Sequence, residues 1–240
     1  MFNSSNIEQI AGRSFDLLVC AGAPAAKWKA NREPEADRAN LHRLVAELAR
    51  VRAQKVVLIS TVDVYPDPAG VDEDSAISSE ALGPYGRHRR ELEQELERRF
   101  PSCVVVRLPA LFGEGLKKNA VYDLLTGNLG PWLVPDAAYQ FYDLGELWTH
   151  LDRALAAGVA RLNLATEPLG MRRIAREAFQ VDLDQICPPV ADGAAPSIRY
   201  DMHTRHAALF GREGQPYLRT ADEVLQRLIA FVRRQRGDRQ

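Results

Sequence analysis

The chain has 240 residues, 46% of them hydrophobic and 26% charged, which is typical of a globular protein with a core of substantial size. Its formal net charge of -1 gives no general attraction to nucleic acid or to an anionic membrane, so we expect neither as a partner. No apolar run reaches the roughly 18 residues of a membrane-spanning helix, and the polar start lacks the parts of a signal peptide, so we expect a cytoplasmic protein.

Three short apolar runs mark the first half of the chain, at residues 15–20, 55–60 and 102–108. Near-continuous aliphatic and β-branched runs are typical of parallel strands covered on both faces, so we expect central strands. Apolar residues at helical spacing over 35–50 and 84–100 predict a helix between each pair of strands. This alternation predicts an α/β fold, a doubly wound parallel sheet.

The second half of the chain is less regular. Apolar residues over 144–157 predict a helix, and residues 161–165 predict one more strand. The segment 188–196, rich in Pro, Ala and Gly, predicts a loop, and Thr220 opens a final helix. The three cysteines, listed here in chain order, are too few and too scattered for a disulfide framework, so we expect buried free thiols: Cys20, Cys103 and Cys187.

The residues most suggestive of chemistry follow the second predicted strand. Thr61 stands at the carboxyl end of that strand, where parallel sheets bind ligands, and Tyr85 opens the next helix. Arg89, four residues after Tyr85, lies on the same helical face, where its charge favours the phenolate. The alternatives are local roles: Thr61 would make a turn bond at the strand end, and Arg89 would be a solvated helix residue that pairs with Glu93.

These residues resemble those of the extended short-chain dehydrogenase/reductases, in the NAD-dependent epimerase/dehydratase family. Members carry a Ser-Ser or Ser-Thr pair and Val-Tyr after a strand, then a Tyr-x-x-x-Lys pair. By this resemblance, Thr61 binds the reacting oxygen, Tyr85 is the acid/base, and Arg89 stands where the family has lysine. Asn40 matches the helix asparagine of the family's catalytic set, with a structural role as its alternative.

Further segments extend the resemblance over nearly the whole chain. Residues 15–22 resemble the strand and small-residue turn beneath the nicotinamide-side ribose, and residues 106–115 resemble the Arg-x-x-x-x-Tyr-Gly-x-Gly segment. The resemblance implies cofactor contacts from nine residues: Ala21, Gly22, Ser60, Tyr85, Arg89, Leu108, Pro109, Ala110 and Leu111.

The resemblance implies hydride transfer between NAD or NADP and a carbon that bears an alcohol or a ketone. The substrate would be a sugar nucleotide or a similar small molecule, and the enzyme an epimerase, dehydratase or reductase. We expect a Rossmann-like dinucleotide-binding domain over 1–115 with parts of 140–170. The remainder, 116–240, would mostly form a substrate lobe and C-terminal helices. A homodimer through the helices around 41–48 and 92–100 is a further expectation.

Two features depart from the family pattern. The family begins with a strand, a Gly-x-x-Gly-x-x-Gly turn and a helix that hold the pyrophosphate, and nothing before Phe15 contains that turn. A guanidinium at Arg89 is also wider and more rigid than a lysine ammonium. These departures leave open a non-catalytic Rossmann-like binding or assembly protein that has lost cofactor chemistry. We also expect the native reading frame to begin roughly 25 to 40 residues further upstream.

A metal site is the last alternative that the sequence suggests. His203 and His206 lie close to Asp201, but a convincing third ligand is missing. We therefore expect surface or loop histidines and no metal.

Overall fold

The computed structural model describes residues 1–130, 132–187 and 198–237, and the predicted loop at 188–196 lies outside them. The chain divides into two compact units. Unit 1 comprises Met1–Asp67, Glu73–Leu108 and Leu155–Asn163, and unit 2 comprises Pro68–Asp72, Pro109–Ala154 and Leu164–Gln240.

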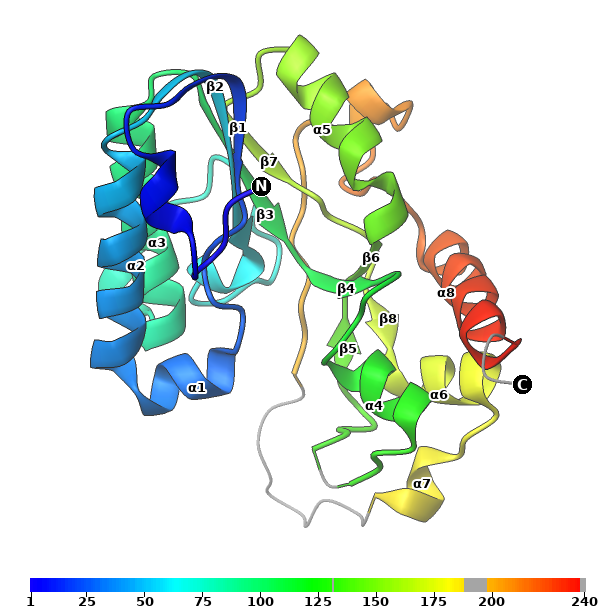
Figure 1. Ribbon diagram of the computed structural model, residues 1–240. Coiled ribbons are helices and arrows are strands. Elements are labelled where there is room, and N and C mark those ends of the chain that lie inside the picture. The colour runs from blue at the N-terminus through cyan, green and yellow to red at the C-terminus, as the bar shows by residue number, and fades with distance from the viewer. Residues whose placement is uncertain (131, 188–197, 238–240) are drawn as a thin grey trace. The chain divides into compact units, whose positions relative to one another are not determined.

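Unit 1 is built around a parallel sheet of four strands in the order β1-β2-β3-β7 (Figure 1). The strands are β1 Ser14–Cys20, β2 Arg52–Thr61, β3 Cys103–Leu108 and β7 Arg161–Asn163. Leu58 in β2 lies beside Cys20 on one side and Val105 on the other. The predicted α/β fold with a parallel, Rossmann-like sheet is confirmed, although the last strand is shorter than the predicted 161–165.

The helices of unit 1 are α1 Lys27–Arg32, α2 Pro34–Leu48 and α3 Pro84–Arg99, with 3-10 turns η1 Ile7–Ile10, η2 Val62–Val64 and η3 Ser79–Ala81. Helices α2 and α3 cover one face of this sheet, and α1 packs against both of them. Both α2 and α3 have proline near their first position, where a missing N–H removes no helical hydrogen bond. The two helices lie side by side, and Leu41 and Leu92 join sheet residues such as Leu58 in one apolar core (Figure 1).

Strand β1 differs from its predicted place. Its apolar run predicts a central strand, but it lies at the edge of the sheet formed by the described residues, with β2 as its one neighbour. Leu18 and Cys20 are buried in the core beneath the helices, whereas Val19 on the other face is 41% exposed. The apolar run reflects burial of one face of the strand. It carries no information about whether a second strand pairs with its outer edge.

Unit 2 contains shorter elements. Its strands form the parallel pair β4 Ala110–Phe112 with β6 Phe141–Asp143 and the antiparallel pair β5 Ala138–Tyr139 with β8 Leu169–Gly170. The helices and turns are α4 Ala120–Thr126, η4 Leu144–Glu146, α5 Leu147–Ala156 (mostly in unit 2), α6 Met171–Phe179, α7 Leu183–Ile186, η5 Ala207–Phe210 and α8 Ala221–Gly237.

A second apolar core lies in unit 2, where Ile174 of α6 and Leu228 of α8 are fully buried. The sequence predicted α8 and the helix at 144–157, which is the turn η4 continued by α5. The three cysteines are free and buried, as predicted. None of the helices in the described parts of the chain is long and apolar enough to cross a membrane.

Candidate active site

Thr61 and Tyr85 come together in unit 1. Thr61 is the last residue of β2 and caps the turn η2, where its hydroxyl oxygen accepts a hydrogen bond of 3.2 Å from the backbone N–H of Asp63. Tyr85 is the second residue of α3, and its side chain is only 8% exposed. The Thr61 hydroxyl lies near enough to the phenol of Tyr85 to lower the pKa of Tyr85. Two residues that are far apart in the sequence thus form one hydroxyl pair at the end of β2.

Two neighbours fix the position of Tyr85. Its backbone N–H donates a hydrogen bond of 3.0 Å to the side-chain oxygen of Asn31, in α1. Gly86 allows the first turn of α3 to approach η2 closely, because a Cβ at this position would lie 2.1 Å from the carbonyl oxygen of Asp63. The lack of a side chain at Gly86 is therefore a geometric requirement for the contact between Tyr85 and Thr61.

Arg89 stacks on Tyr85 and binds a carboxylate. Its guanidinium carbon lies 4.0 Å from the centre of the Tyr85 ring, within cation–π range. Its Nη2 donates hydrogen bonds to Asp37, at 2.9 Å, and to the carbonyl oxygen of Pro24. Its Nη1 donates to the other carboxylate oxygen of Asp37 and, at 3.4 Å, to the carbonyl oxygen of Tyr85. Because Arg89 is only 3% exposed and Glu93 has other partners, the alternative of a solvated residue paired with Glu93 is wrong.

These contacts bear on the role that the resemblance implies for Arg89. The four terminal N–H groups of Arg89 have protein acceptors, and its buried Nε has no hydrogen-bond partner among the described residues. The guanidinium therefore has no terminal donor left for a pair of ribose hydroxyls in this arrangement. Its contact with the Tyr85 ring supports a role in phenolate stabilisation, and ribose binding by Arg89 stays a prediction.

The environment of Tyr85 acts on its pKa in both directions. Burial is the largest effect and raises the pKa of Tyr85, while the charge of Arg89, the hydrogen bond from Thr61 and the charge of Lys27 lower it. The carboxylate of Asp63 raises this pKa further, and the net shift is upward. Tyr85 is therefore a protonated phenol at neutral pH. Arg89 favours the phenolate, as predicted, but burial outweighs it.

Ser60 belongs to a buried polar network next to this pair. Its hydroxyl donates a hydrogen bond of 2.6 Å to Glu93, which also receives bonds of 3.0 and 2.8 Å from Arg107. Arg107 donates a further bond of 2.6 Å to the hydroxyl of Tyr65, and its pairing with Glu93 outweighs burial and raises its pKa. The network ties β2, β3 and α3 together behind the site. A cofactor contact by Ser60 stays a prediction.

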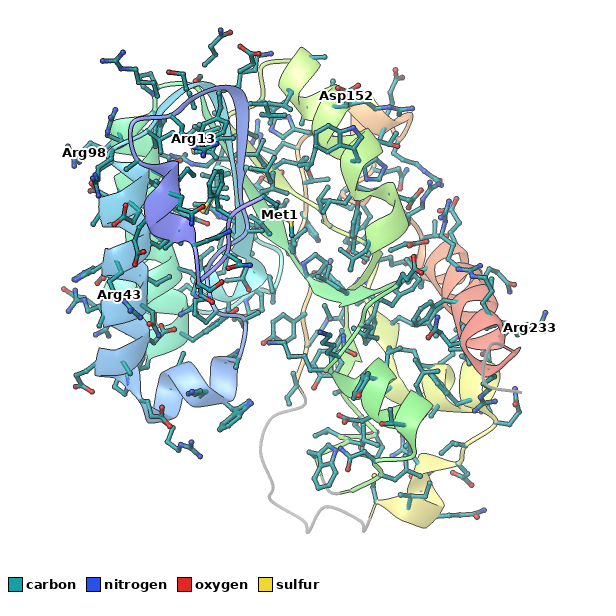
Figure 2. The ribbon with its side chains drawn as sticks, in the orientation of Figure 1. Met1, Arg13, Arg43, Arg98, Asp152 and Arg233 are labelled. Atoms are coloured by element: carbon teal, nitrogen blue, oxygen red, sulfur yellow. The ribbon has the colours of Figure 1, made fainter. Side chains whose placement is uncertain are left out.

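The other predicted site residues of unit 1 lie at the surface. Asn40 is exposed on α2, where its side-chain oxygen accepts a hydrogen bond from Arg43, which Figure 2 labels. Ala21 and Gly22 are exposed directly after β1. No contact between Asn40 and Tyr85 is present among the described interactions of these residues. The catalytic role of Asn40 and the cofactor contacts of Ala21 and Gly22 stay predictions.

The predicted segment 108–111 is divided between the two units. Leu108 ends β3 in unit 1 and is buried, while Pro109, Ala110 and Leu111 belong to unit 2. Ala110 and Leu111 pair with β6. Their contacts with a cofactor stay predictions.

Several residues around the pair were missed by sequence reasoning. Asp37 had a detectable signal, since it shares the apolar stripe of α2 with Leu41 and Leu48, and a carboxylate on such a stripe needs a buried partner. No comparable signal in the sequence pointed to Lys27 or Asn31. Helix α1 is short and irregular in pattern, and both residues meet partners far along the chain.

A metal site is not formed by the residues that the structure describes. Within 1–130, 132–187 and 198–237, no group of three or more His, Cys, Asp or Glu side chains is placed to hold a metal ion. His203 lies 3.2 Å from the hydroxyl of Tyr217 and 3.4 Å from a carboxylate oxygen of Asp201.

The fold and site together define a class of protein. A parallel sheet with helices over it, with a threonine at a strand end near a tyrosine on the next helix, is a Rossmann-like arrangement with a candidate acid/base pair. The model of the NAD dependent epimerase/dehydratase family matches residues 1–129, which is more than half of the chain. The chain belongs to this family, as the resemblance predicted.

Solved structures with the same fold include sugar-nucleotide enzymes. A dTDP-4-dehydrorhamnose reductase from Bacillus anthracis in complex with NADP is 16% identical, with a TM-score of 0.69 over 95% of this chain and 85% of that one. A dTDP-glucose 4,6-dehydratase double mutant from Streptomyces venezuelae with NAD bound is 18% identical, with a TM-score of 0.70 over 96% and 76%. A UDP-glucose 4-epimerase from Thermotoga maritima with UDP-glucose is 15% identical, with a TM-score of 0.63 over 91% and 77%. No curated protein sequence matches the chain significantly.

Proposed function

We propose that the chain is an NAD(P)-dependent enzyme that epimerises, dehydrates or reduces a sugar nucleotide or a similar hydroxy/keto compound. The observation that carries this proposal is the proximity of the Thr61 hydroxyl to the phenol of Tyr85 at the end of β2, in a chain of the NAD dependent epimerase/dehydratase family. The sugar-nucleotide enzymes among its structural relatives support the substrate class. In this proposal unit 1 holds the cofactor, and unit 2 supplies the substrate lobe.

In this proposal the hydroxyl groups of Thr61 and Tyr85 border the reacting end of a nicotinamide cofactor. A bound cofactor would supply hydride donation or acceptance at the substrate carbon. Tyr85 moves the proton of the substrate oxygen, and Thr61 hydrogen-bonds the same oxygen and orients it. Because burial keeps Tyr85 protonated, it acts as the acid when a ketone is reduced. When an alcohol is oxidised, Tyr85 must first lose its proton so that it can act as the base. The positive charges of Arg89 and Lys27 favour that loss.

The test of this proposal is the turnover of Tyr85→Phe. We expect turnover to fall by about two to four orders of magnitude, because the variant keeps the ring but lacks the proton-transfer group. The assay follows oxidation or reduction of NAD(P) with dTDP- and UDP-linked sugars. Tyr122→Phe serves as the matched control, since Tyr122 is a partly buried tyrosine on α4 outside unit 1. Equal turnover of the wild-type protein and Tyr85→Phe ends the catalytic assignment.

A second function is favoured by one observation about Arg89. Its guanidinium is engaged with Asp37 and Pro24. This engagement suits a binding or assembly protein that keeps the family fold without cofactor chemistry. The retained pair of Thr61 and Tyr85 favours the enzyme.

A further inference from the structure

Helix α1 brings a second cation to the Tyr85 site. The ammonium of Lys27 lies 2.6 Å from a carboxylate oxygen of Asp63. The side chain of Lys27 is 48% exposed and that of Asp63 is 18% exposed. This ion pair joins residues 36 positions apart, and it ties the start of α1 to the turn η2 that follows β2.

Asp63 connects this cation to the hydroxyl pair. The second carboxylate oxygen of Asp63 lies 3.5 Å from the Thr61 hydroxyl, and its backbone N–H donates to that hydroxyl at 3.2 Å. The carbonyl oxygen of Asp63 also touches the first turn of α3 at Gly86, the residue after Tyr85. The ammonium of Lys27 is thereby held on the carboxylate whose other oxygen lies 3.5 Å from the Thr61 hydroxyl, near enough for its charge to act on Tyr85.

Arg89 approaches the same tyrosine from a different direction and with less freedom. It stacks on the face of the ring, with the guanidinium carbon 4.0 Å from the centroid, and both oxygens of Asp37 accept its hydrogen bonds. The carboxylate of Asp37 offsets much of the charge of Arg89, as the carboxylate of Asp63 does for Lys27, because in both pairs the opposite charges lie in contact. Lys27 has a flexible stem and a compact charge at a half-exposed position.

We propose that Lys27 is a positioning residue that supplies the adjustable positive charge of the Tyr85 site and stabilises the phenolate, a task for which the family uses the lysine that Arg89 replaces. The inference rests on the proposed function. In the step it assists, the O–H bond of Tyr85 breaks and the proton passes to the substrate oxygen, while the charge left on the phenolate is balanced by the ammonium. Lys27 keeps all its protons.

The charged groups around Tyr85 come from four elements. Lys27 on α1 and Arg89 on α3 favour the phenolate, and Asp63 in η2 disfavours it. Asp37 on α2 acts through Arg89. Lys27 and Asp63 carry opposite charges, so their removal should move the pKa of Tyr85 in opposite directions. Removing Lys27 should raise this pKa, and removing Asp63 should lower it. A merely structural ion pair would not produce this pattern.

The experiment is a spectroscopic titration of Tyr85 in the protein without cofactor. Tyrosinate absorbance is recorded against pH, and the same curve for Tyr85→Phe is subtracted to remove the other tyrosines. We expect Lys27→Met to raise the pKa of Tyr85 by roughly half a unit to one unit, Lys27→Arg to leave it unchanged, and Asp63→Asn to lower it. Lys29→Met is the matched control, because Lys29 is a 60% exposed lysine of the same helix that pairs with Glu33.

An unchanged titration of Tyr85 in a folded Lys27→Met protein would overturn the inference, as would an equal shift in Lys29→Met. Circular dichroism of each variant establishes folding before the titration. The titration needs neither cofactor nor substrate, so its result can overturn the inference about Lys27 without bearing on the proposed function. The proposed function is contradicted by a different result, namely that Tyr85→Phe retains turnover.

Discussion

Asp37, Arg89 and His88 form a buried charged cluster between α2 and α3. Asp37 is 5% exposed, and it accepts hydrogen bonds of 2.9 Å from Arg89 and 2.8 Å from His88. Burial alone would raise the pKa of Asp37, but the hydrogen bonds and charges of Arg89 and His88 outweigh burial and lower it. Two charges removed from water are tolerated here because each neutralises the other.

Replacing Asp37 by Asn should therefore destabilise the fold. The variant leaves the charge of Arg89 buried without its counter-ion, and we expect a loss of about 3 to 5 kcal/mol in the free energy of unfolding measured with urea. Glu91→Gln is the control, because Glu91 and Arg38 form a largely exposed pair whose loss should cost less than about 1 kcal/mol.

The effect of Asp37→Asn should depend on pH in a defined direction. The pKa of Asp37 in the folded protein lies below its ordinary value of 3.8, so its stabilising contribution is present above that value and is lost as pH falls through the folded pKa. The difference in unfolding free energy between wild type and Asp37→Asn should shrink as pH is lowered from about 5 toward 2. A difference that stays constant over this window would contradict the pairing.

At the scale of elements, the contact between α3 and η2 decides the geometry of the site. Helix α3 starts at Pro84 and carries Tyr85 in its first turn, and η2 starts after Thr61. The carbonyl of Asp63 fills the space where a side chain of residue 86 would stand. Packing between two short segments, far apart in sequence, thus sets the distance between the two hydroxyl groups.

Gly86→Ala tests this contact. A Cβ 2.1 Å from a backbone oxygen forces helix and turn apart, so we expect a loss of about 1 to 3 kcal/mol in the free energy of unfolding. Turnover should fall further than stability explains, because Tyr85 moves away from Thr61. Gly83→Ala is the control at the start of the same helix, where the new Cβ would meet its nearest atom, on Asn31, at 3.8 Å, and we expect a cost of about 1 kcal/mol or less. Equal stability of Gly86→Ala and wild type would remove the proposed close approach.

Prediction from sequence succeeded for the elements with a clear pattern. The strands β1, β2 and β3 and the helices α2 and α3 follow from apolar runs and helical spacing within short windows. Helices α1, α4 and α7 are short, and sequence reasoning missed them because a few residues carry too little periodicity. Helix α6 was missed despite its clear apolar face, whose members Ile174 and Ala178 lie one helical turn apart.

For the whole molecule, the two proposed functions differ in whether the chain binds a dinucleotide. The pair of Thr61 and Tyr85 supports an enzyme, and the engaged guanidinium of Arg89 supports a binding or assembly protein. Cofactor binding separates the two functions before any substrate is known.

Calorimetric titration with NADH and NADPH is the corresponding measurement. If the chain is an enzyme of its family, we expect saturable binding of at least one dinucleotide, with one molecule bound per chain. Tyr85→Phe should bind it nearly as well as wild type, because the variant keeps the ring that borders the site. ADP-ribose, which lacks the nicotinamide, serves as the control for contacts at the reacting end. Absence of binding for both dinucleotides at millimolar concentration favours the non-catalytic function.

The sequence by itself determined the α/β class, the parallel strands and the likeness to the NAD-dependent epimerase/dehydratase family, including Thr61 and Tyr85. These conclusions depend on periodicity and motif spacing, which are properties of neighbouring residues. Only the tertiary structure decided that Arg89 binds Asp37, 52 residues away, that Lys27 binds Asp63, and that β1 lies at the edge of the described sheet. The physical reason is that a side chain's partner and a strand's neighbour are set by packing between distant segments, and no local pattern records them.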